Sequence, residues 1–476
     1  MVASIVVPLA GAILAALLPR SAAAVGLATS LLTGCTVLGV VVRAFGAGHA
    51  IVDVGGWAAP LGIRLAIDGL SGLLLAMTAG VGVGVSVYAR VHFADRPEVA
   101  RFFWPLWLFL WAGLDALYQS RDVFNLYVTL ELVGLSAVSL VALTGSATAL
   151  VGAMRYLLVS LVGSIAYLMG VALLYHAYGA LDLGWLAEHA ATDERLAVPL
   201  AVMASGMLLK TGLFPFHVWL PPAHGSAPAP VSALLSALVV KATFYLLVRL
   251  WLTLTPDAHD VETLLGLLGA GAVFWGSLQA LRQTRLKLLV AYSTVAQLGY
   301  LFLAFPLARF DPSLAWRGAL YLAVSHALAK AAMFLAAGNV LARAGRDEIV
   351  ALGRIADRMP LSFAAFALAG ISLAGLPPSG GFVGKWLLLE SAFAQGAWSW
   401  ALVPLAGGAL TAAYVFRVLG AAFTRVERRD ERATTGVEVA SATIVTEWTP
   451  FALALGAVGL GFAAPWLLPM LDGVLP

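Results

Sequence analysis

Long apolar runs separated by short polar stretches recur along the whole chain. A helix needs about 20 mostly apolar residues to cross the hydrocarbon core of a bilayer, and about fourteen stretches meet that requirement. We therefore predict an all-α polytopic membrane protein. The expected helices cover residues 2–19, 22–44, 63–89, 102–119, 122–144, 150–178, 197–216, 229–254, 262–281, 286–305, 315–341, 361–395, 400–424 and 449–470.

The composition favours lipid over water as the solvent. The 476 residues are 61% hydrophobic and 11% charged, whereas soluble domains carry roughly 25% charged residues. The net charge of +3 does not indicate nucleic-acid binding, because the basic residues form short clusters between apolar runs. The single cysteine, Cys35, excludes an intrachain disulfide and a cysteine-held iron–sulfur cluster, and we expect it to be a small core residue.

The loops at the two ends of the predicted helices differ in charge, and basic residues favour the cytoplasmic side. Loops after odd-numbered helices hold Arg20, Arg90, Arg96, Arg101, Arg282, Arg285, Lys287, Arg343, Arg346, Arg354, Arg358, Arg425, Arg428, Arg429 and Arg432. The opposite loops hold Asp53, Glu188, Asp193, Glu194, Asp257, Asp260 and Glu262. We expect both termini on the outer face of the cell (inner) membrane. Because no basic region precedes the apolar stretch 1–18, we interpret it as a first transmembrane helix rather than a cleaved signal peptide.

Two of the predicted helices contain breaks. Pro215 lies near the end of the seventh, and Pro377 and Pro378 lie inside the twelfth. Proline removes a backbone donor, and in lipid such a break survives only where it is buried in protein or lines a water-filled cavity. Broken helices at matching positions of two halves indicate a transport site. We therefore divide the chain into helices 1–3 (1–101), a five-helix repeat (102–254), a second, inverted five-helix repeat (262–425), and a linker with helix 14 (426–476).

Four ionisable residues lie inside apolar runs: Glu131, Lys210, Lys241 and Lys385. Each charge costs about 2.5–3.5 kcal/mol at the centre of a spanning helix, which argues for a functional reason to keep it. Burial lowers the pKa of a lysine from about 10.4 toward neutrality, and a nearby carboxylate raises it again. We therefore hypothesise that movement of Glu131 relative to Lys210 loads and unloads a proton.

Other polar residues could extend such a route. His326 and Lys330 are four residues apart on one helix face and could relay protons between the two broken helices. His217 and His224 flank the first break. Hydroxyl and amide side chains that could hold water between these groups are Tyr156, Ser164, Ser293, Thr294, Gln297 and Ser325.

Several kinds of site are not indicated. The glycines at 80, 82 and 84 lie inside an apolar run without a βαβ context, so close helix packing explains them better than nucleotide binding. We expect no cofactor, no metal site and no catalytic residues, and we do not expect this chain to be an enzyme on its own.

Three stretches resemble the proton-conducting membrane transporter family, which includes the D subunits of Mrp-type Na⁺/H⁺ antiporters, the L, M and N subunits of complex I, and related hydrogenase subunits. They are 210–241, which begins Lys-Thr-Gly-Leu-Phe-Pro-Phe-His, 326–338 from His326 through Lys330, and 375–385, Gly-Leu-Pro-Pro-Ser-Gly-Gly-Phe-Val-Gly-Lys. The resemblance implies fourteen helices with two inverted repeats. It also implies that Glu131 and Lys210 form the essential pair, that Lys241 links the halves, and that Lys385 lies on the exit side.

The resemblance leaves several functions open. The leading interpretation is a subunit of a multi-subunit cation/proton antiporter, in contact with other membrane subunits and moving protons, with Na⁺ or K⁺ as the other ion. A second is a membrane-arm subunit of complex I or a membrane-bound hydrogenase. A third is a proton channel for an uptake partner such as an inorganic-carbon transporter. A scaffold with an inactive path is disfavoured, because it would be free to lose the buried charges.

Overall fold

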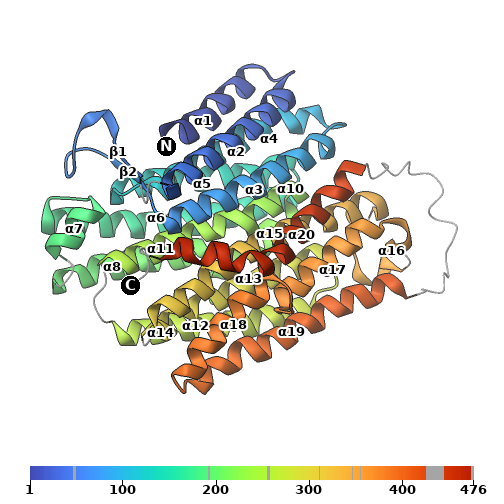
Figure 1. The fold of residues 1–476 in the computed structure, drawn as a ribbon. Coiled ribbons are helices and arrows are strands. Elements are labelled where there is room, and N and C mark those ends of the chain that lie inside the picture. The colour runs from blue at the N-terminus through green and yellow to red at the C-terminus, as the bar shows by residue number, and fades with distance from the viewer. Residues whose placement is uncertain are drawn as a thin grey trace.

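The structure is a computed structural model that describes residues 1–46, 50–190, 193–254, 258–309, 311–345, 347–353, 355–424 and 444–472. Its long helices run roughly side by side and form an elongated bundle (Figure 1). Within these residues ten helices are long and apolar enough to cross a membrane, and Val2–Leu17 and Pro360–Ala374 are shorter apolar helices. The helical membrane fold is therefore confirmed, while the count of fourteen spans and the inverted repeats stay predictions.

The N-terminal part combines helices with a small sheet that we did not predict. Its elements are α1 (Val2–Leu17), α2 (Ala22–Gly46), β1 (Ala50–Asp53), β2 (Arg64–Ile67), α3 (Gly69–His92) and α4 (Pro97–Gln119). The strands pair antiparallel, with Asp53 opposite Arg64. The helix predicted from residue 63 begins instead at Gly69, because Asp68 and Ser71 form a capping box at its N-terminus.

The rest of the described chain is helical. The next elements are α5 (Val123–Val141), α6 (Ala147–Tyr178), α7 (Leu183–Ala190), α8 (Ala197–Thr211), α9 (Leu220–Ser226), α10 (Ala229–Leu234) and α11 (Val240–Leu254). After them come α12 (His259–Arg282), α13 (Leu286–Phe302), α14 (Ala304–Leu307), α15 (Pro312–Ala344), α16 (Ile355–Arg358), α17 (Pro360–Ala374), α18 (Gly380–Ala394), α19 (Trp398–Phe423) and α20 (Ile444–Leu467).

Both predicted helix breaks are present. Helix α8 ends at Thr211 rather than near residue 216, because Gly212 adopts a left-handed conformation (φ 71°) that terminates it. Helix α17 ends in the same way at Gly375 (φ 84°), and α18 starts again after the Ser379 cap. A further irregularity was not predicted: a π-helical turn at Leu235–Val239 joins α10 to α11.

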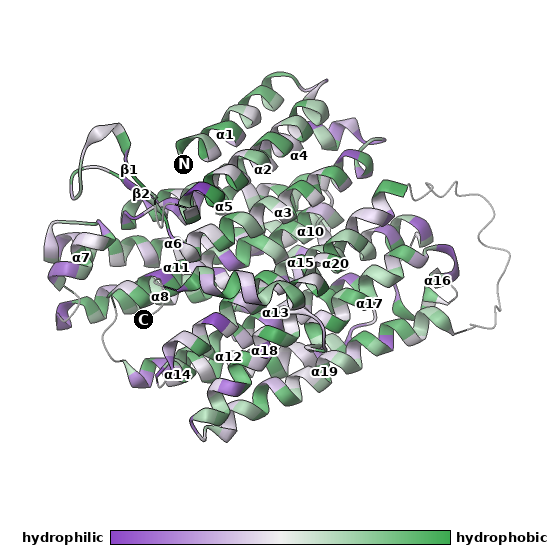
Figure 2. Cartoon of the chain, viewed as in Figure 1, coloured by the Kyte–Doolittle hydropathy of each residue, from purple (hydrophilic) through white to green (hydrophobic). Residues whose placement is uncertain are grey.

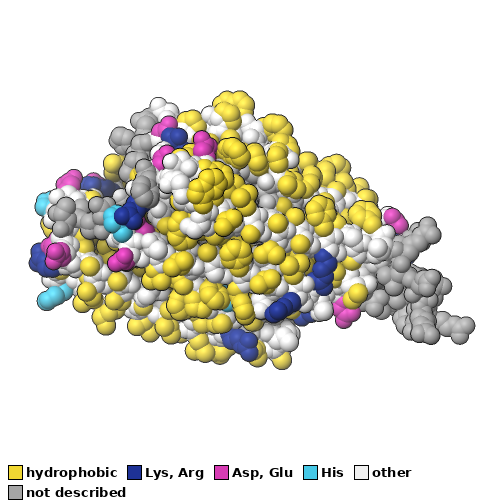
Figure 3. Space-filling model, turned by 90° about the horizontal axis from the view of Figure 1, so that it is seen from below, with side chains coloured by type: hydrophobic (Ala, Val, Ile, Leu, Met, Phe, Trp, Pro, Cys, Tyr) yellow, Lys and Arg dark blue, Asp and Glu magenta, His cyan; other side chains and the backbone are white. Residues whose placement is uncertain are grey.

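Polar residues gather at the two ends of the bundle, and its sides are mainly hydrophobic (Figures 2 and 3). Helix α15 and the unit from α10 through α11 are buried along almost their whole length, whereas α2 and α20 expose most of theirs. The prediction for Cys35 was wrong, because its side chain is exposed on α2 instead of packed in the core. The buried charges discussed below lie in or next to the central helices.

The start of α1 and the end of α20 lie at the same end of the bundle, next to β1, β2 and α7 (Figure 1). Seven of the loop residues used to predict topology lie outside the described residues: Asp257, Arg346, Arg354, Arg425, Arg428, Arg429 and Arg432. The linker predicted from residue 426 also lies outside them up to residue 443.

Candidate functional site

An ion pair joins α5 to the broken end of α8. Lys210 lies in the last turn of α8, is 4% exposed, and donates a hydrogen bond from Nζ to Glu131 Oε1 at 2.9 Å. Glu131 keeps 21% of its side chain exposed. Because the buried ammonium depends on this carboxylate for charge compensation, the two groups form one unit, as the sequence predicted.

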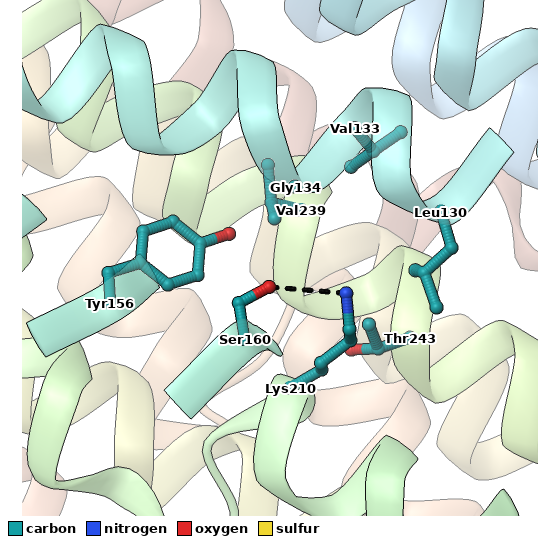
Figure 4. Close-up of a pocket in the computed structure, with 8 residues that line it drawn as sticks. All are labelled: Leu130, Val133, Gly134, Tyr156, Ser160, Lys210, Val239 and Thr243. Atoms are coloured by element: carbon teal, nitrogen blue, oxygen red, sulfur yellow. Dashed lines mark hydrogen bonds between the residues drawn. The ribbon is translucent and has the colours of Figure 1, made fainter. Parts of the chain in front are cut away.

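Serine hydroxyls from α6 complete the surroundings of this pair. Lys210 Nζ also donates to Ser160 Oγ at 3.1 Å, and Ser164 Oγ donates to Glu131 Oε1. Ser160, Tyr156 and Lys210 point into a shared space (Figure 4), which is a cavity of about 10 Å³. A cavity of that size has room for about one water molecule, so the Lys210 ammonium can exchange hydrogen bonds with a mobile partner.

Lys241 lies just after the π-helical turn and is 1% exposed. Its Nζ donates to the carbonyl oxygen of Ser236, five residues earlier in that turn. A π-turn changes the regular i to i−4 pairing of the helix, and such turns occur often at functional sites. The local helix irregularity therefore provides the acceptor that a buried ammonium needs.

Lys330 lies near the middle of α15 and is fully buried. Its Nζ donates to Ser293 Oγ and, at 3.0 Å, to the carbonyl oxygen of Val290 on α13. Thr294, the residue after Ser293, shares a hydrogen bond of 2.9 Å with the hydroxyl of Ser236. The backbone carbonyl of Ser236 in turn accepts the hydrogen bond from Lys241. Ser293 and Thr294 thus connect the surroundings of two buried lysines.

Lys385 binds the end of the other broken helix. Its Nζ donates to the carbonyl oxygen of Leu373 at 2.7 Å and lies 4.1 Å from the centre of the Tyr300 ring. Leu373 belongs to the last turn of α17, where unpaired carbonyls and the helix dipole favour a positive charge. Gln297 donates to the same carbonyl at 3.2 Å. The break at Pro377 and Pro378 therefore creates the binding site for Lys385.

The three predicted histidines have different surroundings. His326 is fully buried, neither ring nitrogen has a hydrogen-bond partner among the described residues, and it lies within electrostatic range of Lys241, Lys330 and Lys385. His224 is also buried, its ring stacks on Phe334, and the Ser232 backbone lies within reach of the ring. His217 accepts a hydrogen bond from Trp275 at 3.2 Å. His326 thus lies near three of the predicted lysines, whereas His217 contacts the aromatic side chains of Phe214 and Trp275.

Lys287 was assigned to a cytoplasmic loop, and that interpretation was wrong. It is the second residue of α13, is 3% exposed, and donates from Nζ to the carbonyl oxygen of Ala227 at the end of α9. Arg285, two residues earlier, does lie at the surface and pairs with Asp347 at 3.0 Å. Lys287 is therefore a further buried lysine, within electrostatic range of His224.

We expect Lys287→Met to lower the free energy of unfolding by about 1–3 kcal/mol, because it leaves the buried Ala227 carbonyl with only the long 3.5 Å contact from Ser232 Oγ. Lys287→Arg keeps a donor and should lose less. Thermal unfolding of the two purified variants beside the wild type measures the difference. Equal unfolding temperatures for all three proteins would contradict this role of Lys287.

A charge cluster that we did not predict lies at the end of the bundle near β1 and β2. Arg249 of α11 contacts both carboxylate oxygens of Asp68, at 2.7 and 2.9 Å, and Arg121 contacts one of them at 2.6 Å. Burial acts to raise the pKa of Asp68, but Arg249 and Arg121 outweigh it and hold that pKa well below its usual range. The cluster ties α3, α4–α5 and α11 together.

Asp115 is another ionisable residue that we did not predict, and it is fully buried in α4. Arg249 and Asp115 lie inside apolar runs, and Lys287 lies at the start of another. The cost of a charge in such a run, which singled out Glu131 and Lys210, would have singled out Arg249 and Asp115 as well.

The buried residues described above lie largely within a stretch that matches a known family. Residues 120–411, more than half of the chain, match the family model described as NADH:quinone oxidoreductase/Mrp antiporter, TM. The N subunit of the NADH-quinone oxidoreductase of Desulforudis audaxviator is 37% identical over 78% of this chain and 75% of its own length. The D subunit of the Na(+)/H(+) antiporter of Bacillus subtilis is 30% identical over 83% of this chain and 80% of its own length.

The fold is similar to that of a chain in the Mrp complex from Dietzia sp. DQ12-45-1b. The match has a TM-score of 0.88 at 23% identity and covers 98% of this chain and 95% of that one. The resemblance drawn from the three sequence motifs is thereby confirmed. The chain is a multi-pass membrane protein that belongs to the NADH:quinone oxidoreductase/Mrp antiporter family.

Proposed function

We propose that this chain is a proton-translocating subunit of a multi-subunit cation/proton antiporter of the Mrp type. The observation that carries the proposal is the Glu131–Lys210 pair, because an acid and a lysine bonded at 2.9 Å next to a helix break can exchange a proton when they separate. A purely structural ion pair has no need of a water-sized cavity beside it.

The proton route continues through the second half of the chain. Lys210 exchanges a proton with Glu131, and Lys241 and Lys330 carry it further, with the hydroxyls of Ser236, Thr294 and Ser293 between them able to donate and accept hydrogen bonds. His326 links these lysines to Lys385 at the α17 break. Each of these lysines has an oxygen acceptor that stabilises its charged form: a carboxylate for Lys210, and carbonyl or hydroxyl oxygens for Lys241, Lys330 and Lys385.

The counter-ion in this proposal is Na⁺ or K⁺, and the partners are other membrane subunits. The complex lies in the cell (inner) membrane. Both termini lie on its outer face. Arg90 and Arg101 lie at one end of the α3 and α4 helices, and β1, β2 and the start of α1 lie at the other end. Because basic residues favour the cytoplasmic side, the end with β1 and β2 is the outer one.

The second candidate is a membrane-arm subunit of an NADH-quinone oxidoreductase or a related redox complex. The 37% identity to an N subunit favours it. In that setting the electron chemistry belongs to partner subunits, and the buried residues of this chain keep the same roles.

Purification of the protein from its native membrane in a mild detergent, followed by mass spectrometry of the associated proteins, separates the two candidates. The antiporter predicts small hydrophobic subunits and related antiporter-like chains, with no redox proteins. Iron–sulfur, flavin or nickel proteins in the same complex would overturn the antiporter in favour of the redox pump. A single soluble partner without other membrane subunits would contradict both and favour a proton channel for an uptake protein.

A further inference from the structure

The carboxyl group of Asp115 has no bonding partner in the described structure. The residue is fully buried in α4, and neither Oδ1 nor Oδ2 has a hydrogen-bond partner there. Asp115 also takes part in none of the ion pairs among the described residues. Buried polar groups are almost always paired, so such a group calls for a specific explanation.

Three other buried polar groups lie on the same helix face or opposite it. Tyr118 and Gln119 follow Asp115 by three and four residues and share its face of α4, and Gln119 Oε1 has no hydrogen-bond partner among the described residues. Thr78 Oγ1 of α3 is buried as well. The hydroxyls of Tyr118 and Thr78 lie within reach of a hydrogen bond to each other, and Tyr118 lies close enough to Asp115 for its charge to act on it.

The packing of α3 against α4 places Thr78 opposite Asp115. Trp107 donates to Ser86 at 2.8 Å, and one turn further along, Gly82 packs against the Trp111 ring. Because the helices run antiparallel, the next turn brings Thr78 to the level of Asp115.

Asp115 lies at the level of Glu131 of α5, but on the face of α4 that points away from α5. Gly113 packs against Val133 of α5, so the antiparallel register pairs position 115 with position 131. Two residues turn a helix by about 200°, which directs Asp115 away from α5 and toward α1 and α3. On the α1 side, Gln119 donates to Ser4 Oγ at 3.0 Å. Asp115 is therefore separate from the Glu131–Lys210 pair.

An ionised carboxylate without partners would cost several kcal/mol in this apolar interior. A bound proton removes the charge, and the neighbouring hydroxyls of Thr78 and Tyr118 can both donate and accept hydrogen bonds. We propose that Asp115 is a reversible proton-binding site, separate from the lysine series, whose proton exchanges through Thr78 and Tyr118 with the end of the bundle that holds Asp68.

The route to that end is short. The Tyr118 and Tyr245 rings are in edge contact with centres 5.1 Å apart, and the Tyr245 hydroxyl donates to the Tyr118 carbonyl oxygen at 2.8 Å. Arg249 Nε lies 3.3 Å from that hydroxyl, and Arg249 holds the partly exposed Asp68. About one turn of helix, from Asp115 to Tyr118, therefore separates the carboxyl group from the Tyr245, Arg249 and Asp68 contacts at the edge of the bundle, and opening of these contacts is the step that we expect to bring water to Tyr118.

Infrared spectroscopy of the purified protein at neutral pH tests the site without reference to transport. The carbonyl band of an un-ionised carboxylic acid should be present in the wild type and in Glu131→Gln, and lost in Asp115→Asn. It should shift when the sample is moved into D₂O, and more slowly in Tyr118→Phe. Asp115→Glu, which keeps a carboxyl group, should retain a band at a changed frequency and serves if the asparagine variant does not fold.

Two results would overturn the proton-binding site, and a third would overturn its route. Spectra of the wild type and Asp115→Asn that coincide in this region would show that Asp115 carries no proton. A band that stays unshifted after prolonged exposure to D₂O would show a permanently protonated structural group. An unchanged exchange rate in Tyr118→Phe would overturn the route through Tyr118. None of these readouts depends on the proposed antiporter function, so either proposal can fail without the other.

Discussion

Replacing Lys210 with methionine is expected to lower proton transport by about 10²-fold or more, the usual effect of removing a positioned proton-transfer group. Methionine fills a similar volume but removes the ammonium that binds Glu131 and Ser160. The carboxylate then remains, held by Ser164 alone among the groups described around it. Transport is measured as ΔpH formation in vesicles that contain the intact complex, normalised to the amount of protein.

Lys210→Arg is the matched control for charge. Arginine keeps a positive charge that can pair with Glu131, but it stays protonated at all relevant pH values. If Lys210 transfers protons, the arginine variant should be about as defective as the methionine variant. Wild-type transport in Lys210→Arg would instead assign Lys210 a purely electrostatic role.

The largest effect on stability is expected for Arg249→Met. Removing one partner from a buried ion pair takes away compensation from the remaining charge, which costs about 3 kcal/mol or more. Asp68 would keep its contact with Arg121, yet lose the two-point contact that joins α3 to α11. The expected result is a lower unfolding temperature in detergent, with a smaller decrease for Arg121→Met, whose side chain is more exposed. Equal decreases for the two variants would contradict this ranking.

The same cluster predicts a dependence on pH. The pKa of Asp68 is held below its usual range in the folded protein, so the unfolded chain binds more protons in acid. Its contribution to the free energy of unfolding is therefore complete above the ordinary aspartate pKa of about 4 and is lost as the pH falls below it. Acid should consequently lower the unfolding temperature of the wild type more than that of Arg249→Met.

Much of the fold follows from the sequence because membrane insertion depends on local composition. Apolar length is enough to locate α6 and α15, and the Gly-Pro pattern after Ala374 locates the break between α17 and α18. The hairpin of β1 and β2 was missed because its strands are four residues long and lie beside apolar helices. The π-helical turn at Leu235–Val239 was missed because no glycine or proline marks it.

The candidate site was predictable where the cost of a buried charge identifies it. From that cost we identified Glu131, Lys210, Lys241 and Lys385, and in the structure a hydrogen bond joins Lys210 to Glu131. It did not predict that carbonyl oxygens hold Lys241 and Lys385, since those acceptors depend on where two helices become irregular. Lys287 was misplaced because a lysine near the end of an apolar run has the same local sequence whether it faces a loop or the interior.

The most direct test of the account is the proton transport of Glu131→Gln in vesicles that contain the intact complex. Glutamine keeps the size and hydrogen-bonding capacity of the side chain but not its charge, so it cannot exchange a proton with Lys210. Glu390→Gln is the matched control, because Glu390 is exposed on α18, five residues after the buried Lys385 and on a different face of that helix. We predict that Glu131→Gln abolishes transport while Glu390→Gln retains it. Transport at the wild-type rate in assembled complexes with Glu131→Gln would contradict the account.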